Sequence, residues 1–279
     1  MILELPEEDF PRASHLLGDL AHYLVLTTLL EGRTPGKIWA NDATQPTMAL
    51  VWDRLNGFFF LAGDSSDGNL NQELNSLIVD SMFPQAIRLG YRHFFLQFAP
   101  QRWDAQVAVI LKGATPGKCF VDCYRLDAGR STIRVNGATT LPAGYELARI
   151  TEGLLSRTDV ENLAEVVSCI QACWGSTDRY VDDGGIGYCL VKGEVIASWC
   201  STDYLIGNSC ELYVETFEGY QRKGLGTLTA AACVQACVAQ GLTVYWHCFE
   251  DNLGSVTIAE KLGFEETAEC PVYVMEVRP

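Results

Sequence analysis

The sequence predicts an α/β fold with a mixed sheet, divided between two domains. Its 279 residues amount to about two domains at the usual ~150 residues each. Apolar residues make up 48% and charged residues 20%, which is typical of a chain that buries a core. Short apolar runs of strand length alternate with longer segments of helical character, and glycine, proline and asparagine separate them.

The first half begins with a helical segment and continues with three strands. An Asn-Gly pair within residues 54–57 predicts a hairpin turn between the second and third strands. The aromatic run at 58–60 fits a buried strand better than a ligand site, and this half shows no catalytic motif. The expected elements are a helix at 14–30, strands at 37–40, 47–52 and 58–62, a helix at 70–89, a strand at 91–98, a helix at 103–111 and a strand at 120–126.

The second half alternates more regularly between strands and helices. Thr158 is expected to cap its first helix, with Glu161 three residues later as the capping-box partner. Gly241 and Gly263 are expected to end the other two helices. The expected elements are a strand at 145–150, a helix from 158 to about 173, a hairpin of strands at 187–191 and 195–202, a strand at 210–216, a helix at 224–240, a strand at 243–249, a helix at 255–262 and a strand at 272–277.

A change of composition marks the boundary between the halves. Residues 127–144 are rich in glycine, threonine and proline, which predicts a linker or an extended crossover strand. We therefore expect an N-terminal α/β domain at 1–130 and a second domain at 140–279. Residues 1–140 carry 15 acidic and 12 basic side chains, a net charge of −3, whereas residues 141–279 carry 20 and 8, a net charge of −12.

Charge and hydropathy argue against several functions. The overall net charge of −15 disfavours a broad cationic nucleic-acid surface and attraction to an anionic lipid surface. The longest apolar run, at 24–30, is far shorter than the roughly 18 residues of a membrane span. The first nine residues are acidic and lack the basic region of a signal peptide. We expect a cytoplasmic protein without nucleic-acid or membrane partners.

Eleven cysteines, all at or after Cys119, need an interpretation. An odd count in a long chain argues against a disulfide-stapled scaffold. Three pairs have the spacing that places two thiols on one helix face, where a metal pair is conceivable. Histidines with ligand-like spacing are lacking, so we expect these cysteines to be small core residues and expect no metal. The pairs are Cys119/Cys123, Cys169/Cys173 and Cys233/Cys237.

The strongest functional signal lies at residues 211–227, a strand followed by a tight turn and a helix start with Gly224 and Gly226. Glycine lets the backbone approach a ligand closely, and the free N–H groups of a helix N-terminus bind phosphate. Two adjacent basic residues add positive charge to a half that is otherwise acidic. A Walker A loop and a dinucleotide fingerprint are excluded, because Lys223 precedes the glycines and Thr229 stands where a third glycine is needed.

The pattern Q-x-x-G-x-G that begins at Gln221 resembles the cofactor loop of the GNAT N-acetyltransferases. Downstream, N-x-x-S at Asn252 and the I-A-E-K-L-G-F ending at Phe264 resemble the last helix of that family. Over residues 145–279 the chain resembles the GNAT members that carry an extra N-terminal domain. The resemblance implies a GNAT acetyltransferase fold for the second domain, and the element order of the first domain suggests a degenerate copy of it.

The same resemblance implies acetyl-CoA as the co-substrate. The pyrophosphate would lie on the backbone amides of the loop, and the thioester carbonyl would bond to the strand before it, where negative charge develops during attack. The next helix would contact the cofactor arm. The implied cofactor-binding residues are Val214, Thr216, Gln221, Arg222, Lys223, Gly224, Leu225, Gly226, Thr227, Asn252 and Ser255.

Acetyl transfer to an amine needs a base that removes a proton from the nucleophile. Glu211 matches a strand position at which the family often carries a glutamate. Glu215 is the second candidate, because strand alternation places it on the same face, together with Tyr213. His247, on the neighbouring strand, is the third.

One departure from the family pattern concerns the general acid. Many members carry a tyrosine before the E-K-x-G-F ending, where this chain has Ala259. Tyr220, Tyr213, Cys248 or water would then protonate the departing thiolate, or the thiolate leaves without help.

The acidic second half suits a cationic acceptor, because its charge would steer amines toward it. Polyamines, aminoglycoside-like antibiotics, lysine side chains and N-terminal amines all fit, although the charge could equally serve solubility alone. The function expected is acetyl transfer to a primary amine of a small cationic molecule. A non-catalytic module that binds CoA or another ligand, and a protein acetyltransferase, are the alternatives. The first half could form a homodimer surface or one wall of the acceptor site, and without a glycine loop we do not expect it to bind CoA.

Overall fold

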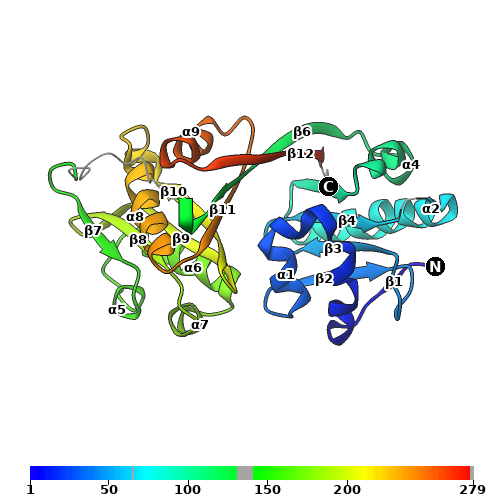
Figure 1. The fold of residues 1–279 in the computed structure, drawn as a ribbon, viewed down its shortest axis with the longest axis horizontal. Helices are drawn as coiled ribbons and strands as arrows, with labels where there is room; N and C mark the ends of the chain where they lie inside the picture. The colour runs from blue at the N-terminus through cyan, green and yellow to red at the C-terminus, as the bar shows by residue number, and fades with distance from the viewer. Residues whose placement is uncertain (65, 131–140, 277–279) are drawn as a thin grey trace. The chain divides into compact units, whose positions relative to one another are not determined.

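The computed structural model describes residues 1–64, 66–130 and 141–276, and these form two compact units (Figure 1). Unit 1 comprises Met1–Phe120 together with Cys270–Pro279, and unit 2 comprises Val121–Glu269. The units differ from the expected domains, because residues 121–130 belong to unit 2 and the end of the chain belongs to unit 1. Most of the expected linker, residues 131–140, lies outside the described residues.

Unit 1 is built on a sheet of order β1-β2-β3-β4-β5-β12, in which β12 is the strand Glu265–Glu276. β4 and β5 run parallel, whereas the other neighbours run antiparallel. Its elements are β1 (Leu3–Glu4), the 3-10 segments η1 (Glu7–Leu16) and η2 (Gly18–His22), α1 (Leu24–Leu30), β2 (Gly36–Ala40), β3 (Met48–Asp53), β4 (Phe58–Gly63), α2 (Gly68–Ser76), the π-helical turn η3 (Leu77–Met82), α3 (Phe83–Arg88), β5 (His93–Ala99), η4 (Gln101–Gln106), α4 (Val107–Ile110) and the start of β6 (Gly117–Leu126).

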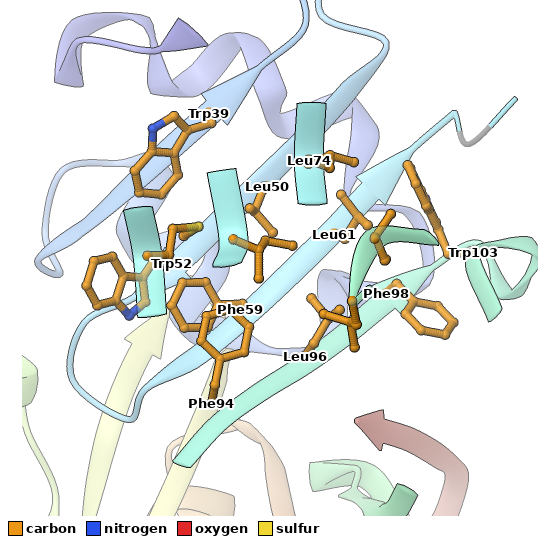
Figure 2. Close-up of a cluster of buried hydrophobic side chains, with 14 of the residues drawn as sticks. Trp39, Leu50, Trp52, Phe59, Leu61, Leu74, Phe94, Leu96, Phe98 and Trp103 are labelled. Carbon is orange, nitrogen blue, oxygen red and sulfur yellow. The ribbon is translucent and has the colours of Figure 1, made fainter. Parts of the chain in front are cut away.

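The core of unit 1 is aromatic (Figure 2). The rings of Phe59 and Phe94 stack with centroids 3.6 Å apart, and Trp52 stacks on Phe59 at 5.1 Å. All three side chains are buried, and Phe60 is buried as well, as expected for a core strand. The sheet and the helices that follow β4 are therefore held together by apolar packing.

Two helices expected in unit 1 are interrupted in the structure. The single helix expected at 14–30 is wrong, because Gly18, with a φ of +50°, begins a new 3-10 segment after η1, and the extended Tyr23, with a ψ of 99°, separates that segment from the short helix α1. The helix expected at 70–89 contains a π-helical turn directly before Pro84, which has no N–H to donate to the preceding turn.

A polar cluster in unit 1 joins η4 to the strands β6 and β12. The Tyr273 hydroxyl donates to Asp104 Oδ1 at 2.7 Å, and Lys118 Nζ donates to the same oxygen at 3.0 Å. These two hydrogen bonds hold the pKa of Asp104 below its usual value.

Unit 2 is built on a sheet of order β7-β8-β9-β10-β11-β6, with β12 beside β6. β10 and β11 run parallel, and the other pairs along β7 to β6 run antiparallel. Its elements are β7 (Glu146–Arg149), α5 (Glu152–Leu155), α6 (Leu163–Trp174), α7 (Thr177–Asp182), β8 (Gly187–Lys192), β9 (Val195–Ile206), β10 (Ser209–Thr216), the 3-10 turn η6 (Glu218–Tyr220), α8 (Leu225–Ala239), β11 (Thr243–Phe249), α9 (Leu253–Leu262) and β12 (Glu265–Glu276), with η5 (Ala128–Arg130) after β6.

Helices cover the two faces of this sheet. α8 and α9 pack on one face around Trp246, and α6 and α7 pack on the other around Trp199. The expected capping role of Thr158 is wrong, since α6 begins after Asn162, whose φ is +69°. Gly263 ends α9 as expected, with a φ of +82°.

The two units repeat one connection. In unit 1, three antiparallel strands (β2, β3, β4) lead through helices to β5, which is parallel to β4. In unit 2, β8, β9 and β10 lead through α8 to β11, which is parallel to β10. The structure thus has the duplicated order that the sequence suggested.

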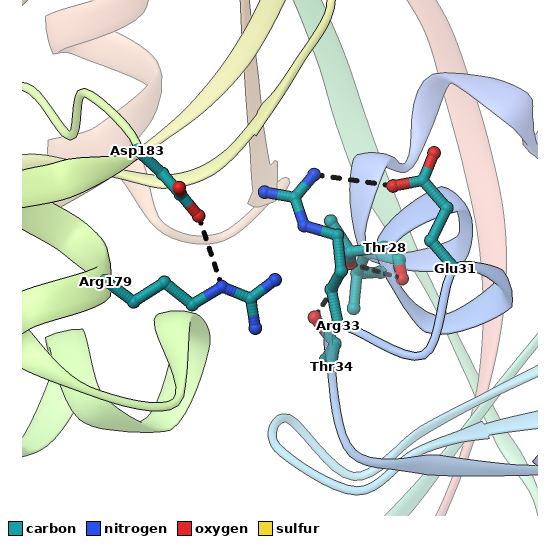
Figure 3. A network of polar contacts seen from close by, with 7 residues as sticks. Thr28, Glu31, Arg33, Thr34, Arg179 and Asp183 are labelled. Atoms are coloured by element: carbon teal, nitrogen blue, oxygen red, sulfur yellow. Dashed lines mark hydrogen bonds and ion pairs between the residues drawn. The ribbon is translucent and has the colours of Figure 1, made fainter.

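Short-range polar contacts hold helix ends in each unit (Figure 3). After α1 in unit 1, the buried Thr34 hydroxyl donates to the Thr28 hydroxyl at 2.8 Å. After α7 in unit 2, Arg179 Nε donates to Asp183 at 3.2 Å. Within the described part of the chain, no helix combines the length and apolar content needed to span a membrane.

Candidate active site

β10 and β11 separate along their length. They pair only from Ser209–Thr243 to Glu211–Tyr245. Beyond this point β10 continues to pair with β9, whereas β11 continues to pair with β6. A β-bulge accompanies the separation, between Glu211 and Leu212. The backbone of β10 beyond Glu211 can therefore hydrogen-bond an extended ligand, as an additional strand would.

The turn after β10 prepares the start of α8. Arg222 has a φ of +60° and Gly224 a φ of +75°, so two residues adopt the left-handed conformation just before the helix. Among the described residues, no side chain caps α8. Its first N–H groups and the positive end of its dipole are thus available to an anion.

A buried hydroxyl network fixes this turn against the sheet. Ser198 Oγ donates to the Glu215 carbonyl at 2.8 Å and lies 2.9 Å from Thr216 Oγ1 and 3.0 Å from Thr229 Oγ1. Thr229 in turn donates to carbonyls in the first turn of α8. Gln221 Nε2 donates to the Thr216 carbonyl at 3.1 Å, which closes the turn from the other side.

The turn, the end of β10 and the start of α9 enclose a cavity of about 450 Å³. All of the predicted cofactor residues except Lys223 line it, and three residues that the motif analysis missed, Gly254, Thr257 and Ile258, complete it. Of the glycines that line the cavity, Gly226 has the least room for a side chain, because a Cβ there would be 3.0 Å from Thr216 Oγ1 and 3.3 Å from Ile258 Cδ1. Lys223 instead donates to the carbonyl of Gly219 at 2.8 Å.

Asn252 and Ser255 lie at the start of α9, whereas Tyr220 lies in η6. Asn252 caps α9 by accepting from the Ser255 N–H at 3.2 Å, and Trp246 Nε1 donates to Ser255 Oγ at 2.9 Å. Tyr220 lies outside the residues that line the cavity and has the Lys223 ammonium 5.5 Å from its ring centroid. The structure thus brings Asn252 and Ser255 to the cavity and turns Tyr220 toward Lys223.

Two of the three candidate bases form one hydrogen-bonded pair. His247 Nδ1 donates to Glu211 Oε1 at 2.8 Å, and the two side chains are only 8% and 16% exposed. Donation from Nδ1 leaves Nε2 with a lone pair when the ring is neutral, and Nε2 itself is buried with almost no exposed surface. The residues lie 36 positions apart on parallel strands, and each was singled out separately in the sequence.

Glu211, Tyr213 and Glu215 share one face of β10, as the alternation predicts, since Cys210 and Leu212 pack into the core under α8. This is the face that α6 covers, because Trp199 in the α6 core has its ring 5.1 Å from that of Tyr213. Burial, followed by the negative charge of Glu215, raises the pKa of Tyr213 above its usual value. Tyr213 therefore stays protonated and can donate a hydrogen bond.

The family position of the general acid is apolar in the structure. Ala259 has no exposed surface and packs in the core beneath α9. Cys248, another candidate acid, is buried in that same core, and burial raises the pKa of its thiol. A protonated thiol on β11 beside Ser255 is thus present near the cavity.

The corresponding helix start in unit 1 is closed by a carboxylate. The Asp67 side chain accepts from the N–H groups of Asn69 and Leu70 at 2.9 and 3.1 Å. An anion at this position would meet a negative charge and N–H groups that are already bonded. The repeated fold therefore offers an open helix start in unit 2 and a capped one in unit 1.

Comparison with known proteins decides the family. The model of the GNAT acetyltransferase family matches residues 14–273, across both units. The chain belongs to the GNAT acetyltransferase family. It is 24% identical over 274 residues to the uncharacterized N-acetyltransferase YdfB of Bacillus subtilis (strain 168), covering 98% of each chain.

Solved structures support the GNAT fold. A GCN5-related N-acetyltransferase-like protein from Streptococcus suis 89/1591 matches with a TM-score of 0.67 and 24% identity, over 96% of this chain and 99% of the other. A tandem GNAT protein from the clavulanic acid biosynthesis pathway matches with a TM-score of 0.61 and 15% identity, over 100% and 99%. The chain is an acyltransferase of a family that uses acetyl-CoA and acts on amines of small molecules or proteins.

Proposed function

We propose that this GNAT protein transfers an acetyl group from acetyl-CoA to a primary amine of a small cationic molecule by direct attack. The observation that carries the proposal is the cavity of unit 2, which gathers the turn at 221–227, the end of β10 and the first turn of α9 around one space. Its volume of about 450 Å³ lies within the usual range of ligand sites, roughly 300–1,000 Å³.

The residues around the cavity fit the chemistry of CoA. Amide N–H groups at the start of α8 and the Arg222 guanidinium would hold the pyrophosphate. The missing Cβ at Gly226 leaves room between Thr216 and Ile258. The β10 backbone near Val214 would hold the thioester carbonyl, and bound acetyl-CoA would supply the activated acetyl group.

The pair of Glu211 and His247 would prepare the acceptor amine. An ammonium must lose a proton before its nitrogen can attack, and a base within hydrogen-bond reach, or one water away, can take it. Glu211 orients His247, and the two side chains are largely shielded from solvent. We propose that the pair acts as one proton-accepting unit, whereas the sequence offered Glu211 and His247 as alternative candidates for the base.

Charge on the α6 face of the sheet supports the proposed acceptor class. Glu215 lies two residues beyond Tyr213 on this face, and unit 2 lies in the strongly acidic half of the chain. Both features favour a cationic amine over a neutral or anionic one. We propose that unit 1, whose helix start is occupied by Asp67, does not bind CoA and instead supports the acetyltransferase unit.

Thermal unfolding with acetyl-CoA, CoA and ATP tests the cofactor assignment. Ligand that binds the folded state stabilises it by RT ln(1 + [L]/Kd), about 2.7 kcal/mol at one hundred times Kd. We expect a rise in Tm with both CoA species and none with ATP. Gly226→Val should abolish the rise, whereas Gly219→Ala, where a Cβ meets open space, should keep it. No rise in the wild type would refute the cofactor assignment.

An amine panel then tests the reaction. CoA formation should be followed by chromatography, because eleven free cysteines would consume a thiol reagent. Polyamines, aminoglycosides and lysine derivatives should give product, and neutral amines should give less. Absence of turnover with every amine, despite CoA binding, would favour a non-catalytic CoA-binding module, the alternative that the buried Ala259 supports.

A further inference from the structure

A second cluster of reactive side chains lies between α6 and β9. Cys169 and Cys173 occupy successive turns of α6, and Asp203 lies on β9. The two sulfur atoms and a carboxylate oxygen all lie within 4.8 Å of one another. All three residues are half-buried, so the cluster is enclosed but reachable from solvent.

The fold builds this cluster from two anchored elements. Glu211 pairs with Tyr204 and Leu212 with Thr202, so Asp203 is the extra residue of a β-bulge. The indole N–H of Trp174, at the end of α6, donates to the Thr202 carbonyl at 2.8 Å in a buried contact. This bond fixes α6 on β9 one residue away from Asp203.

We propose that Cys169, Cys173 and Asp203 form a binding site for a thiophilic divalent cation of the Zn²⁺ class. Side chains at i and i+4 of a helix bind one metal ion from the same face, as the two histidines of H-E-x-x-H do. Thiolate sulfur and carboxylate oxygen are both zinc ligands, and three protein ligands leave a fourth position for water. Binding converts both thiols to thiolates, and their two protons pass to solvent without any redox change.

The environment separates this pair from another with the same spacing. Cys233 and Cys237 also share a face of α8, but both are fully buried in the apolar core of unit 2. Cys169 and Cys173 instead have a carboxylate oxygen of Asp203, from the neighbouring strand β9, within 4.8 Å of their sulfur atoms. The sequence could not show this, because the aspartate is 30 residues or more from either cysteine.

The proposed metal site lies on the same face of the sheet as Glu215, the carboxylate that we expect to favour a cationic acceptor amine. Trp199 packs under α6 and also contacts Tyr213, which joins the cluster to the face of β10 that carries Glu215. A bound dication would lower the negative charge that a cationic acceptor meets. The metal site itself rests on the geometry of α6 and β9 and not on the proposed acetyl transfer.

Titration of the reduced, metal-free full chain with Co²⁺, and then displacement by Zn²⁺, tests the proposal. We expect a thiolate-to-cobalt charge-transfer band that saturates at one equivalent and disappears when Zn²⁺ is added. The double variant Cys169→Ser/Cys173→Ser should lose the band. Asp203→Asn should keep a band but weaken Zn²⁺ affinity by roughly tenfold or more, since even residues that only support metal ligands contribute that much.

A matched control uses the other two half-buried cysteines, Cys119 and Cys270. Replacing both by serine should leave the cobalt band and the Zn²⁺ affinity unchanged. Circular dichroism would show that each variant is folded. Absence of a thiolate band in the reduced wild type, equal loss in the control, or an unchanged affinity in Asp203→Asn would overturn the assignment. None of these measurements involves acetyl-CoA, so they stand whether or not the acetyl transfer is found.

Discussion

Replacing Glu211 by glutamine tests the proton-accepting pair directly. The substitution keeps the size of the side chain but removes its charge, and it puts an NH₂ group or an amide oxygen 2.8 Å from His247 Nδ1. An amide oxygen can still accept the bond but does not stabilise an imidazolium as a carboxylate does. A positioned base contributes roughly 10²–10⁴-fold to such a reaction, which is about 2.7–5.4 kcal/mol at 1.36 kcal/mol per decade.

We therefore expect Glu211→Gln to lower kcat by roughly 10²–10⁴-fold at saturating amine. The rise in Tm with CoA should persist, because Glu211 does not line the cavity among the described residues. Glu215→Gln is the matched control, two strand positions along the same face. It should raise KM for a cationic amine and leave kcat much closer to the wild-type value.

Initial rates from chromatographic separation of CoA, measured at varied amine and fixed saturating acetyl-CoA, give both parameters. A kcat for Glu211→Gln within about tenfold of the wild type would refute the assigned role, because it falls below the contribution of a positioned base. Loss of the CoA-dependent Tm rise in that variant would show that the change acts on folding or on cofactor binding instead.

Three further predictions concern stability. Ser198→Ala should lower the free energy of unfolding of unit 2 by about 1–3 kcal/mol, measured by urea denaturation, because it leaves buried acceptors unsatisfied; Ser201→Ala on the same strand, whose hydroxyl finds no partner among the described residues, should cost much less. Phe94→Ala should cost about 3–5 kcal/mol in unit 1, and Phe95→Ala, which removes a half-buried ring, clearly less. The pKa of Asp104 is lowered in the folded protein, so its carboxylate stabilises the folded state at pH values above its unfolded pKa. This stabilisation is lost as the pH falls through the folded pKa. Asp104→Asn should therefore flatten the acid limb of a curve of unfolding free energy against pH, and an unchanged limb would contradict this.

The conformation of the proposed cofactor loop could be predicted from sequence because its determinants are local. Gly224 and Gly226 act through backbone conformation and the absence of a Cβ, and both effects occur within the segment that carries the motif. The start of α9 is equally local, since Asn252 caps a helix three residues ahead of Ser255. Local features of this kind can be recognised directly in a sequence pattern.

The Glu211–His247 pair and the proposed metal cluster depend on strand register, which the sequence does not show. Glu211 reaches His247 because β10 and β11 run parallel and part just beyond them. Asp203 reaches α6 because a single extra residue in β9 changes the alternation there. One-residue shifts of this kind exchange the faces of a strand, and no local preference specifies them.

The two units share a topology but differ at the start of the helix that follows the antiparallel strands. Both pass from an antiparallel strand into a helix that leads to a parallel strand, and the dipole at the start of that helix is the same in kind. The difference lies in one position: Asp67 supplies an internal anion for α2, while Gly224 supplies none for α8. A capped helix start is stabilised without a ligand, whereas an open one gains the same bonds only when an anion binds. The helix start that lacks a side-chain cap is therefore the one suited to binding, and we expect the CoA-dependent stabilisation to come from unit 2.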